Sequence, residues 1–272
     1  MTLTRRQAID LLDRHDVRPT RSLGQNFVVD PNTVRRIVRL AGITRGDPVV
    51  EVGAGLGSLT LALVEAGAEV TAVELDRHLL PVLDEVLRSA DPAPRVVHAD
   101  ALKVDWDDLL AGHPHWHLVA NLPYNVATPL VLDLLDSSAA IDRMLVMVQR
   151  EVGERLAAGP GTSAYGIPSV KIAYWASAEI VGRVGPSVFL PRPKVESVLV
   201  RIVRRSRPAT AADPDRMFTL VRAGFGQRRK MLRRSLAALV TTDDFARAEI
   251  APETRAEQLS VVEWGRLAGA PE

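Results

Sequence analysis

The chain has 272 residues, 47% of them hydrophobic, and a formal net charge of +1. This length suits one large or two unequal domains with a sizeable core. The absence of cysteine excludes disulfides, thiolate zinc sites and a cysteine nucleophile. No apolar run reaches the roughly 18 residues of a membrane span, and the first residues lead into charges instead of a signal-peptide core. We therefore expect a cytoplasmic protein with no membrane partner.

Two helices are predicted at the start of the chain, over residues 5–13 and 32–41, the second with Asp30 as its N-cap and Pro31 at its first position. Short β-branched runs of strand length then alternate with helical segments. The expected strands are 49–52, 69–74, 95–98, 117–120 and 144–148, and the expected helices are 58–66, 77–89 and 127–135. This alternation predicts an α/β fold, a mostly parallel sheet with helices on both faces.

Two further strands, 178–184 and 195–203, flank the proline-rich segment 186–193 and predict a terminal antiparallel hairpin that completes the sheet. The composition of residues 207–214 is typical of a linker. Beyond it the apolar pattern is wholly helical, with helices expected in 217–225, 231–240, 244–250 and 257–267. We therefore predict two domains, an α/β domain over residues 1–206 and a small all-helical domain over residues 207–272.

The charge is distributed unevenly. The stretch 201–234 has eleven basic and two acidic residues, a net charge of +9, so the rest of the chain carries −8. Most of these basic residues are arginines, whose guanidinium groups bind phosphate oxygens in bidentate fashion. The stretch therefore favours a nucleic-acid-binding surface, with Arg228, Arg229 and Lys230 as predicted RNA contacts. The alternative is a solvated helix face.

A glycine-rich turn, Glu51-Val52-Gly53-Ala54-Gly55-Leu56-Gly57, follows the first predicted strand of the sheet. Its glycines fill the first, third and fifth positions, whereas a dinucleotide fingerprint requires the first, third and sixth. The turn resembles that of S-adenosylmethionine-dependent methyltransferases, in which the missing side chains let the backbone approach the cofactor.

Acidic residues follow the next two strands. Glu74 ends the second strand, where a carboxylate can accept hydrogen bonds from both ribose hydroxyls. Asp100 follows the third strand, where it can accept from an adenine amino group. Either residue alone can equally be a helix N-cap. Together with the glycine turn, these acids follow the ends of successive strands. This arrangement favours a cofactor pocket, because ligands of open α/β sheets bind at the carboxyl ends of the strands.

The tetrapeptide Asn121-Leu122-Pro123-Tyr124 ends the fourth strand, about 70 residues after the glycine turn, and should lie on the same edge of the sheet. The Asn121 side-chain oxygen and the Leu122 carbonyl can each accept one hydrogen of an adenine N6 amino group, which orients the nitrogen. Pro123 would fix the turn and Tyr124 would stack on a flipped base. The alternative is an ordinary strand-end turn with a partly buried tyrosine.

With these motifs the chain resembles the ribosomal RNA adenine N6-dimethyltransferase family of the bacterial small-subunit type, from about residue 18 to about residue 267. The likeness rests on the motifs at 23–27, 51–57, 121–125, 148–152, 189–195 and 225–230. It implies a Rossmann-like class I S-adenosylmethionine methyltransferase domain. It also implies dimethylation of two adjacent adenosines in a hairpin loop near the 3′ end of 16S rRNA, within the small ribosomal subunit, by a monomer that contributes to small-subunit biogenesis.

The resemblance further implies a set of site residues. For S-adenosylmethionine these are Gln25, Asn26, Val28, Gly53, Gly55, Glu74, Leu75, Asp100, Ala101 and Asn121. The catalytic residues would be Asn121, Leu122, Pro123 and Tyr124. Phe189 would be a second stacking surface and Lys194 a phosphate contact in the substrate cleft, although the prolines around them equally suit a plain hairpin.

Three other functions compete with this one. A sister branch methylates one adenosine of large-subunit RNA and usually has serine and isoleucine where this chain has Gly24 and Leu122, which favours the small-subunit type. A second alternative is an assembly factor that acts chiefly by binding the immature small subunit. A DNA adenine methyltransferase ranks third, because its usual tetrapeptide and a separate base-reading domain are absent.

The alternating histidines His113, His115 and His117 suggest a metal site only weakly. No carboxylate lies close to them in sequence, the intervening proline suggests a loop, and methyl transfer needs no metal. We therefore predict no metal ion.

Overall fold

The computed structural model describes residues 2–20, 23–123 and 126–269. The chain divides into two compact units. The first contains the residues up to Gly153 together with Glu179–Val203, and the second contains Glu154–Ala178 and the residues from Arg204 onwards. This corrects the predicted division into 1–206 and 207–272 in one respect, because residues 154–178 cluster with the C-terminal helices.

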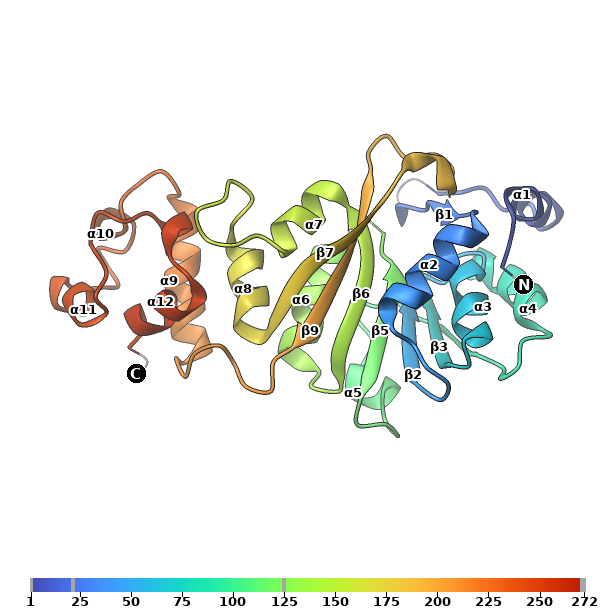
Figure 1. Cartoon of the computed structure of the whole chain (residues 1–272), viewed down its shortest axis with the longest axis horizontal. Coiled ribbons are helices and arrows are strands. Elements are labelled where there is room, and N and C mark those ends of the chain that lie inside the picture. The colour runs from blue at the N-terminus through green and yellow to red at the C-terminus, as the bar shows by residue number, and fades with distance from the viewer. Residues whose placement is uncertain (1, 21–22, 124–125, 270–272) are drawn as a thin grey trace. The chain divides into compact units, whose positions relative to one another are not determined.

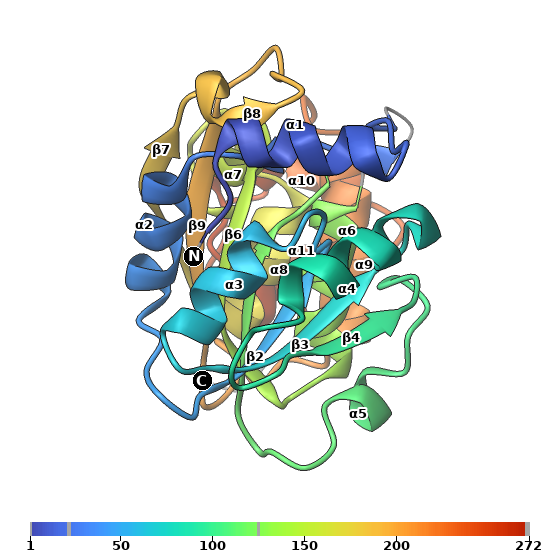
Figure 2. The same ribbon diagram turned by 90° about the vertical axis from the view of Figure 1, so that its right-hand side faces the viewer.

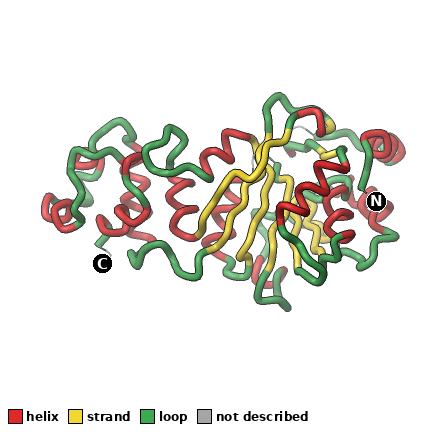
Figure 3. Tube along the Cα trace, viewed as in Figure 1, coloured by secondary structure: helices red, strands yellow, loops and turns green. Residues whose placement is uncertain are grey.

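Within the described residues, the first unit is built on a seven-stranded sheet with the strand order β4-β3-β2-β5-β6-β9-β7 (Figure 1). Neighbouring strands from β4 to β6 are parallel, and β9 is antiparallel to β6. Figure 3 shows the strands as one continuous sheet. The strands are β2 (Pro48–Val52), β3 (Glu69–Glu74), β4 (Arg95–His98), β5 (Trp116–Asn121), β6 (Ile141–Gln149), β7 (Ala176–Val184) and β9 (Ser197–Arg204). The predicted parallel sheet with an antiparallel end is confirmed.

Helices cover both faces of this sheet because successive strand side chains point to opposite sides. Val119 and Leu145 belong to a buried cluster with α2 and α3, whereas their neighbours Leu118 and Met144 are also buried and face the other side, where α6 lies behind the sheet in Figure 1. The helices before the boundary are α1 (Arg5–Arg14), α2 (Pro31–Ala41), α3 (Ser58–Glu65), η2 (Arg77–Leu79), α4 (Leu80–Leu87), α5 (Trp106–Leu109) and α6 (Ala127–Ser137).

The predicted start of α2 is confirmed. The Asp30 carboxylate accepts a hydrogen bond from the Thr33 amide at 2.9 Å, and Pro31 follows it in the first turn. Gly42 ends the helix in the left-handed conformation, with φ +69°.

A second, two-stranded sheet was not predicted from the sequence. It pairs β1 (Phe27–Val28) with β8 (Phe189–Leu190), which follows η3 (Pro186–Val188), in antiparallel register. The short ladder joins the segment after α1 to the connection between β7 and β9.

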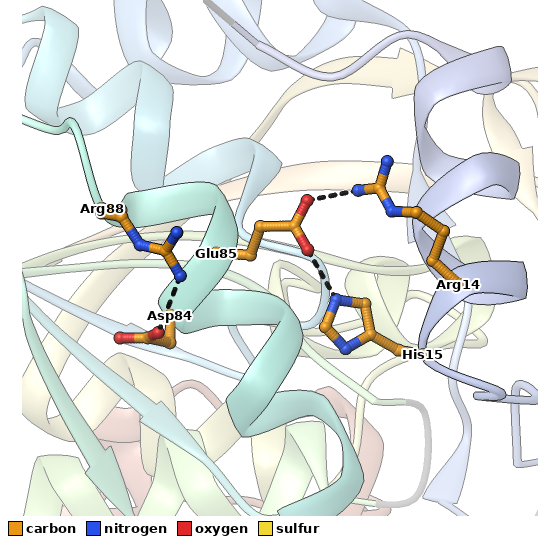
Figure 4. Close-up of polar contacts among 5 residues, drawn as sticks. All are labelled: Arg14, His15, Asp84, Glu85 and Arg88. Carbon is orange, nitrogen blue, oxygen red and sulfur yellow. Dashed lines mark hydrogen bonds and ion pairs between the residues drawn. The ribbon is translucent and has the colours of Figure 1, made fainter.

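Helix α1 is held to the rest of the first unit by apolar and charged contacts. Leu11 and Leu12 are buried in a cluster that includes Val82 of α4. At the end of α1 the Glu85 carboxylate pairs with the Arg14 guanidinium and, at 2.7 Å, with His15 Nε2 (Figure 4). The His15 hydrogen bond lowers the pKa of Glu85 below its ordinary value, with a smaller contribution from Arg14. In Figure 2, α1 accordingly lies above α4.

The second unit is mainly helical and has its own core around Phe218, Leu232 and Trp264. Its helices are α8 (Ile167–Trp175), α9 (Pro214–Gly226), α10 (Leu232–Ser235), α11 (Thr242–Arg247), η4 (Ala256–Gln258) and α12 (Val261–Leu267), and α7 (Arg150–Leu156) runs across the boundary. Contacts of α8 with α9 and α12 explain why residues 154–178 belong to this unit. No helix in the described ranges is long and apolar enough to cross a membrane.

The helix predicted over 231–240 is much shorter than expected. The α-helix ends at Ser235, and the chain continues in turns closed by main-chain hydrogen bonds such as that from Val240 to Leu236. Met231 also forms an isolated antiparallel bridge with Arg255, so the second unit is not wholly helical. Apolar spacing alone does not distinguish a helix from successive turns over such a short segment.

Candidate active site

A cavity of about 110 Å³ opens at the carboxyl ends of β2, β3 and β5 and beside the residues that follow β4. Of the ten residues predicted to bind a cofactor, nine line it: Gln25, Asn26, Gly53, Gly55, Glu74, Leu75, Asp100, Ala101 and Asn121. Leu122 and Pro123 also line it, so the glycine turn and the described part of the tetrapeptide share one cavity. Tyr124 lies outside the described residues.

Val28 is the exception among the predicted cofactor residues. Its main chain belongs to the β1–β8 ladder opposite Phe189, and its side chain is buried in the hydrophobic core. The cavity is lined by the residues just before it, Leu23–Phe27. Val28 therefore does not line the cavity with its side chain, and the predicted contact of its main chain with the cofactor stays a prediction.

The glycines of the turn satisfy two different requirements. Gly53 and Gly55 have φ values of +75° and +59°, in the left-handed region that L side chains rarely adopt. A Cβ atom at Gly55 would lie 2.9 Å from Phe27 Cδ1, whereas one at Gly53 would lie 3.6 Å from Pro123 Cδ. Gly55 therefore permits close packing on Phe27, and Gly53 keeps the space between the turn and Pro123 free.

Glu74 is a buried carboxylate that faces this cavity. One oxygen, Oε2, accepts a hydrogen bond from the Gly55 amide and the other, Oε1, accepts one from the Asp76 amide, both at 2.8 Å. Burial raises the pKa of Glu74, and these two hydrogen bonds act in the opposite direction. The Leu75 main chain also lowers this pKa through a hydrogen bond, and the carboxylate retains a lone pair with which it can accept from a ligand hydroxyl.

Glu51 lies beneath the turn and is 1% exposed. Its Oε2 accepts a hydrogen bond from Thr60 Oγ1 at 2.6 Å. Burial raises the pKa of Glu51 to about 8, despite the opposing effect of Thr60. The side chain is therefore mainly neutral at pH 7, and it packs under the turn without lining the cavity.

The segment that follows α1 closes one side of the cavity. Gln25 Nε2 donates to Asp76 Oδ2 at 2.7 Å, and Gln25 Oε1 accepts from the Thr20 amide at 2.7 Å. The next residue, Asn26, accepts a hydrogen bond at its main-chain oxygen from Asn121 Nδ2 at 2.9 Å. This segment therefore contacts both the residues that follow β3 and the end of β5.

The tetrapeptide continues the sheet for one residue and then turns. The Leu122 amide donates to the Met147 carbonyl at 3.1 Å, as in the β5–β6 ladder. The Pro123 carbonyl accepts from the amides of Val126 and Ala127 at 3.1 and 3.2 Å, which starts α6. Because the Asn121 amino group donates to Asn26, its Oδ1 is the atom that remains to accept a hydrogen bond from a substrate.

Asp100 both lines the cavity and closes a turn. Its Oδ1 accepts from the Leu102 amide at 3.0 Å, and its Oδ2 lies 3.4 Å from the exposed Lys103 Nζ. The alternative prediction for Asp100 was a helix N-cap. Its carboxylate does accept a main-chain hydrogen bond in this way, but in a turn instead of a helix. The adenine contact stays a prediction.

Sequence reasoning missed several apolar residues of the cavity. Leu102 lines it and is 42% exposed, close to the predicted Leu75, which is 47% exposed. Leu23, Phe27 and Leu79 line it as well. Their apolar side chains gave no signal in the sequence, because apolar residues of a cavity and of a core have the same composition.

The predicted substrate residues are not all where they were expected. Phe189 is 1% exposed and packs in the core beside Val28, so its ring presents no face to a base; the stacking role is corrected. Lys194 is exposed and does not line the cavity. In the second unit, Arg228 Nε pairs with Glu257 Oε2 at 2.8 Å.

Arg228 also donates to the Ser163 carbonyl at 2.8 Å, so it supports the structure of its own unit. Its neighbours Arg229 and Lys230 are exposed, and neither has an ion pair within the described ranges. These two and Lys194 stay predicted phosphate contacts.

The three histidines do not converge. His113 Nε2 lies 3.5 Å from a Glu69 oxygen, and His115 Nδ1 lies 3.3 Å from an Asp142 oxygen. His117 is half-buried on β5, and burial lowers its pKa. Over the part of the chain that the structure describes, no cluster of metal-ligating side chains is present.

Comparison with known proteins agrees with this geometry. The sequence model of the ribosomal RNA adenine dimethylase family matches residues 17–269. The ribosomal RNA small subunit methyltransferase A of Kineococcus radiotolerans is 49% identical over 274 residues, which cover 98% of this chain and 90% of that protein. The protein of the same name from Streptomyces coelicolor is 49% identical over 262 residues, with coverage of 93% and 91%.

Two solved structures have the same fold. A dimethyladenosine transferase from Plasmodium falciparum superposes with a TM-score of 0.73 at 22% identity, covering 88% of this chain and 94% of that one. The 23S rRNA methyltransferase ErmE gives a TM-score of 0.70 at 24% identity, with coverage of 89% and 98%. The predicted Rossmann-like methyltransferase fold is confirmed, and so is the resemblance drawn from the motifs: the chain belongs to the ribosomal RNA adenine dimethylase family.

Proposed function

We propose that the protein transfers methyl groups from S-adenosylmethionine to N6 of two adjacent adenosines in a hairpin loop near the 3′ end of 16S rRNA, and dimethylates each of them. Family membership and near-half identity with small-subunit methyltransferases over almost the whole chain support this substrate. The observation that carries the proposal is the single cavity lined by both Gly53 and Asn121. A methyl donor and an acceptor nitrogen must meet in one cavity for direct transfer.

The residues of the cavity fit S-adenosylmethionine. Gly53 and Gly55 line the cavity without side chains and have φ values that favour glycine, so their main chain is open to the methionine part. Glu74 retains a lone pair for a ribose hydroxyl, and the exposed faces of Leu75 and Leu102 suit a flat adenine ring. When bound, S-adenosylmethionine supplies an electrophilic methyl carbon attached to a positively charged sulfur.

The chain would orient the accepting nitrogen. Asn121 Oδ1 accepts one N6 hydrogen, while the bond from its Nδ2 to Asn26 keeps the side chain from rotating. The Leu122 carbonyl accepts the second hydrogen, and Pro123 fixes the turn that presents it. Tyr124 stays the predicted stacking partner of the flipped base. No strong side-chain base is needed, because the nitrogen becomes acidic once it carries the additional methyl group.

The RNA substrate suits this cavity because bases in single-stranded loops can be splayed out at modest cost. Arg229 and Lys230 would contribute phosphate contacts from the second unit. We further propose that the protein acts as a monomer in the cytoplasm, on the small ribosomal subunit and in its biogenesis.

The test is to incubate the protein with labelled S-adenosylmethionine and, in parallel, with small subunits that lack the modification, with large-subunit RNA and with DNA, and then to map the methylated bases. We expect N6-dimethyladenosine at two neighbouring positions of one loop. Label confined to large-subunit RNA or to DNA would reject the proposal in favour of the corresponding alternative enzyme. Tight binding to small subunits without any transfer would favour an assembly factor.

A further inference from the structure

A continuous series of hydrogen bonds runs behind the cavity and links the glycine turn to the segment after α1. The Gly55 amide donates to Glu74, the Asp76 amide donates to the other oxygen of Glu74, and the Asp76 carboxylate accepts from Gln25, which in turn accepts from Thr20. Asp76 is 8% exposed and does not line the cavity. We infer that Asp76 is a positioning residue, which fixes the Gln25–Asn26 wall of the methyl-donor cavity relative to Glu74.

The hydrogen-bonding partners determine which chemical groups these two positions need. Asp76 Oδ1 accepts from the His78 amide at 3.0 Å and caps η2, so only Oδ2 faces Gln25. Gln25 must present its oxygen to the Thr20 amide and its amino group to Asp76. A carboxylate at 76 and a carboxamide at 25 are therefore complementary in one orientation only.

The position of this wall affects both halves of the reaction. Gln25 and Asn26 line the cavity, and the Asn26 carbonyl accepts the hydrogen bond that orients Asn121. A wall displaced by loss of the Asp76 contact would weaken binding of the methyl donor and would also release Asn121. This inference rests on the proposed function for its ligand, whereas the hydrogen bonds themselves are independent of any ligand.

Exchanging the two side-chain types tests the inference. In Asp76→Asn the carboxamide oxygen keeps the cap on the His78 amide, so the amino group faces Gln25 Nε2 and two donors meet. In Gln25→Glu two carboxylates would lie 2.7 Å apart. In the double variant, the carboxamide at position 76 caps with its oxygen and donates from its nitrogen to one oxygen of the carboxylate at position 25. The other oxygen of that carboxylate accepts from the Thr20 amide, so every bond is restored and only the bond between positions 76 and 25 has its direction reversed.

We expect Asp76→Asn to raise the Kd for S-adenosylmethionine about tenfold, because two donors are left opposed, and Gln25→Glu to raise it about tenfold to 100-fold, because two carboxylates are. The double variant should return to within about threefold of the wild type. The measurement is calorimetric titration of the full-length protein, accompanied by thermal unfolding to verify that each variant is folded. Asp30→Asn is the matched control, since Asp30 also caps a helix start and asparagine caps equally well.

A second readout needs no ligand. The Thr20 amide donates to Gln25, so its hydrogen exchange should be faster in each single variant and slow again in the double variant. A double variant that is folded but as weak and as rapidly exchanging as the single variants would overturn the inference. Wild-type protein that binds S-adenosylmethionine but leaves small-subunit RNA unmethylated would instead contradict the proposed function, while the pattern of rescue would still support the role of Asp76.

Discussion

The Nδ2 atom of Asn121 donates a hydrogen bond of 2.9 Å to the main-chain oxygen of Asn26. The contact joins the end of β5 to the segment after α1. It fixes the orientation of the Asn121 side-chain amide through a main-chain atom of the fold. The side-chain oxygen is thereby available to a substrate before any substrate binds, which avoids an ordering cost during the reaction.

Two substitutions of Asn121 should therefore differ. Asn121→Ala removes the acceptor and should lower kcat about 100-fold to 1000-fold, the usual effect of losing one oriented hydrogen-bonding group. Asn121→Asp keeps an acceptor but sets a carboxylate against the Asn26 carbonyl, so it should also weaken S-adenosylmethionine binding. Single-turnover transfer to small subunits and calorimetric titration measure the two effects.

Retained binding of the Asn121→Ala protein to small subunits would separate docking from chemistry. Wild-type transfer rates in this variant would contradict the role given to Asn121. A loss of both binding and transfer would show that the two activities cannot be separated at this residue.

Gly55 should tolerate a methyl group less well than Gly42, although both have positive φ. Alanine at either position costs about 1 kcal/mol or more in backbone strain. At Gly55 the new Cβ would also meet Phe27 at 2.9 Å, whereas at Gly42 nothing lies within 4 Å. Overpacking adds roughly 1–3 kcal/mol, so Gly55→Ala should lower the free energy of unfolding by more than Gly42→Ala does. Urea unfolding compares them, and equal losses would show that the contact with Phe27 relaxes freely.

Glu51 should make the protein less stable as the pH rises. Its pKa is about 8 in the folded protein and near the ordinary 4.5 when unfolded, so the folded state holds a proton that the unfolded state releases. The stabilisation is complete below pH 4.5 and is lost as the pH rises toward 8, by about 1.4 kcal/mol per pH unit. Glu51→Gln keeps the acceptor for Thr60 but does not titrate.

Urea unfolding between about pH 5 and 9 measures this difference. The stability of the wild type relative to Glu51→Gln should fall with pH up to about 8 and then level off. A difference that does not change with pH would mean that Glu51 is already ionised in the folded protein.

Arg228 and Arg229 should behave differently although they are adjacent. Arg228 pairs with Glu257, whereas Arg229 is exposed beside Lys230. Replacing Arg229 and Lys230 together with alanine should weaken RNA binding and reduce the slope of log K against log salt by about 1.5, since each phosphate contact contributes about 0.7–0.9. Filter binding of small-subunit RNA at several salt concentrations measures the slope.

Arg228→Ala is the comparison. It should change this slope little, because the Arg228 charge already pairs with a carboxylate. The substitution instead removes the hydrogen bond from the guanidinium to the Ser163 carbonyl. A slope change of about 0.7 or more for Arg228→Ala, the size of a full phosphate contact, would show that the ion pair opens on RNA.

Local chemistry along the chain was enough to predict the strands of the large sheet, most of the helices and most of the cavity, although α5, α7 and α8 were not predicted. Apolar residues at intervals of two or about 3.6 identify the elements whose faces must be buried. In a parallel sheet all strands end at one edge, so Gly53, Glu74, Asp100 and Asn121 could be placed together without coordinates. Helix α2 followed in the same way from Asp30 and Pro31.

Contacts between residues far apart in sequence were decided only by tertiary packing. Phe189 is buried because β8 pairs with β1, Arg228 is engaged because Glu257 reaches it, and Asp76 meets Gln25 across the cavity wall. The polarity and spacing of side chains in the sequence predict which of them face water and which face a core. They do not predict which distant partner the folded chain brings within hydrogen-bonding distance.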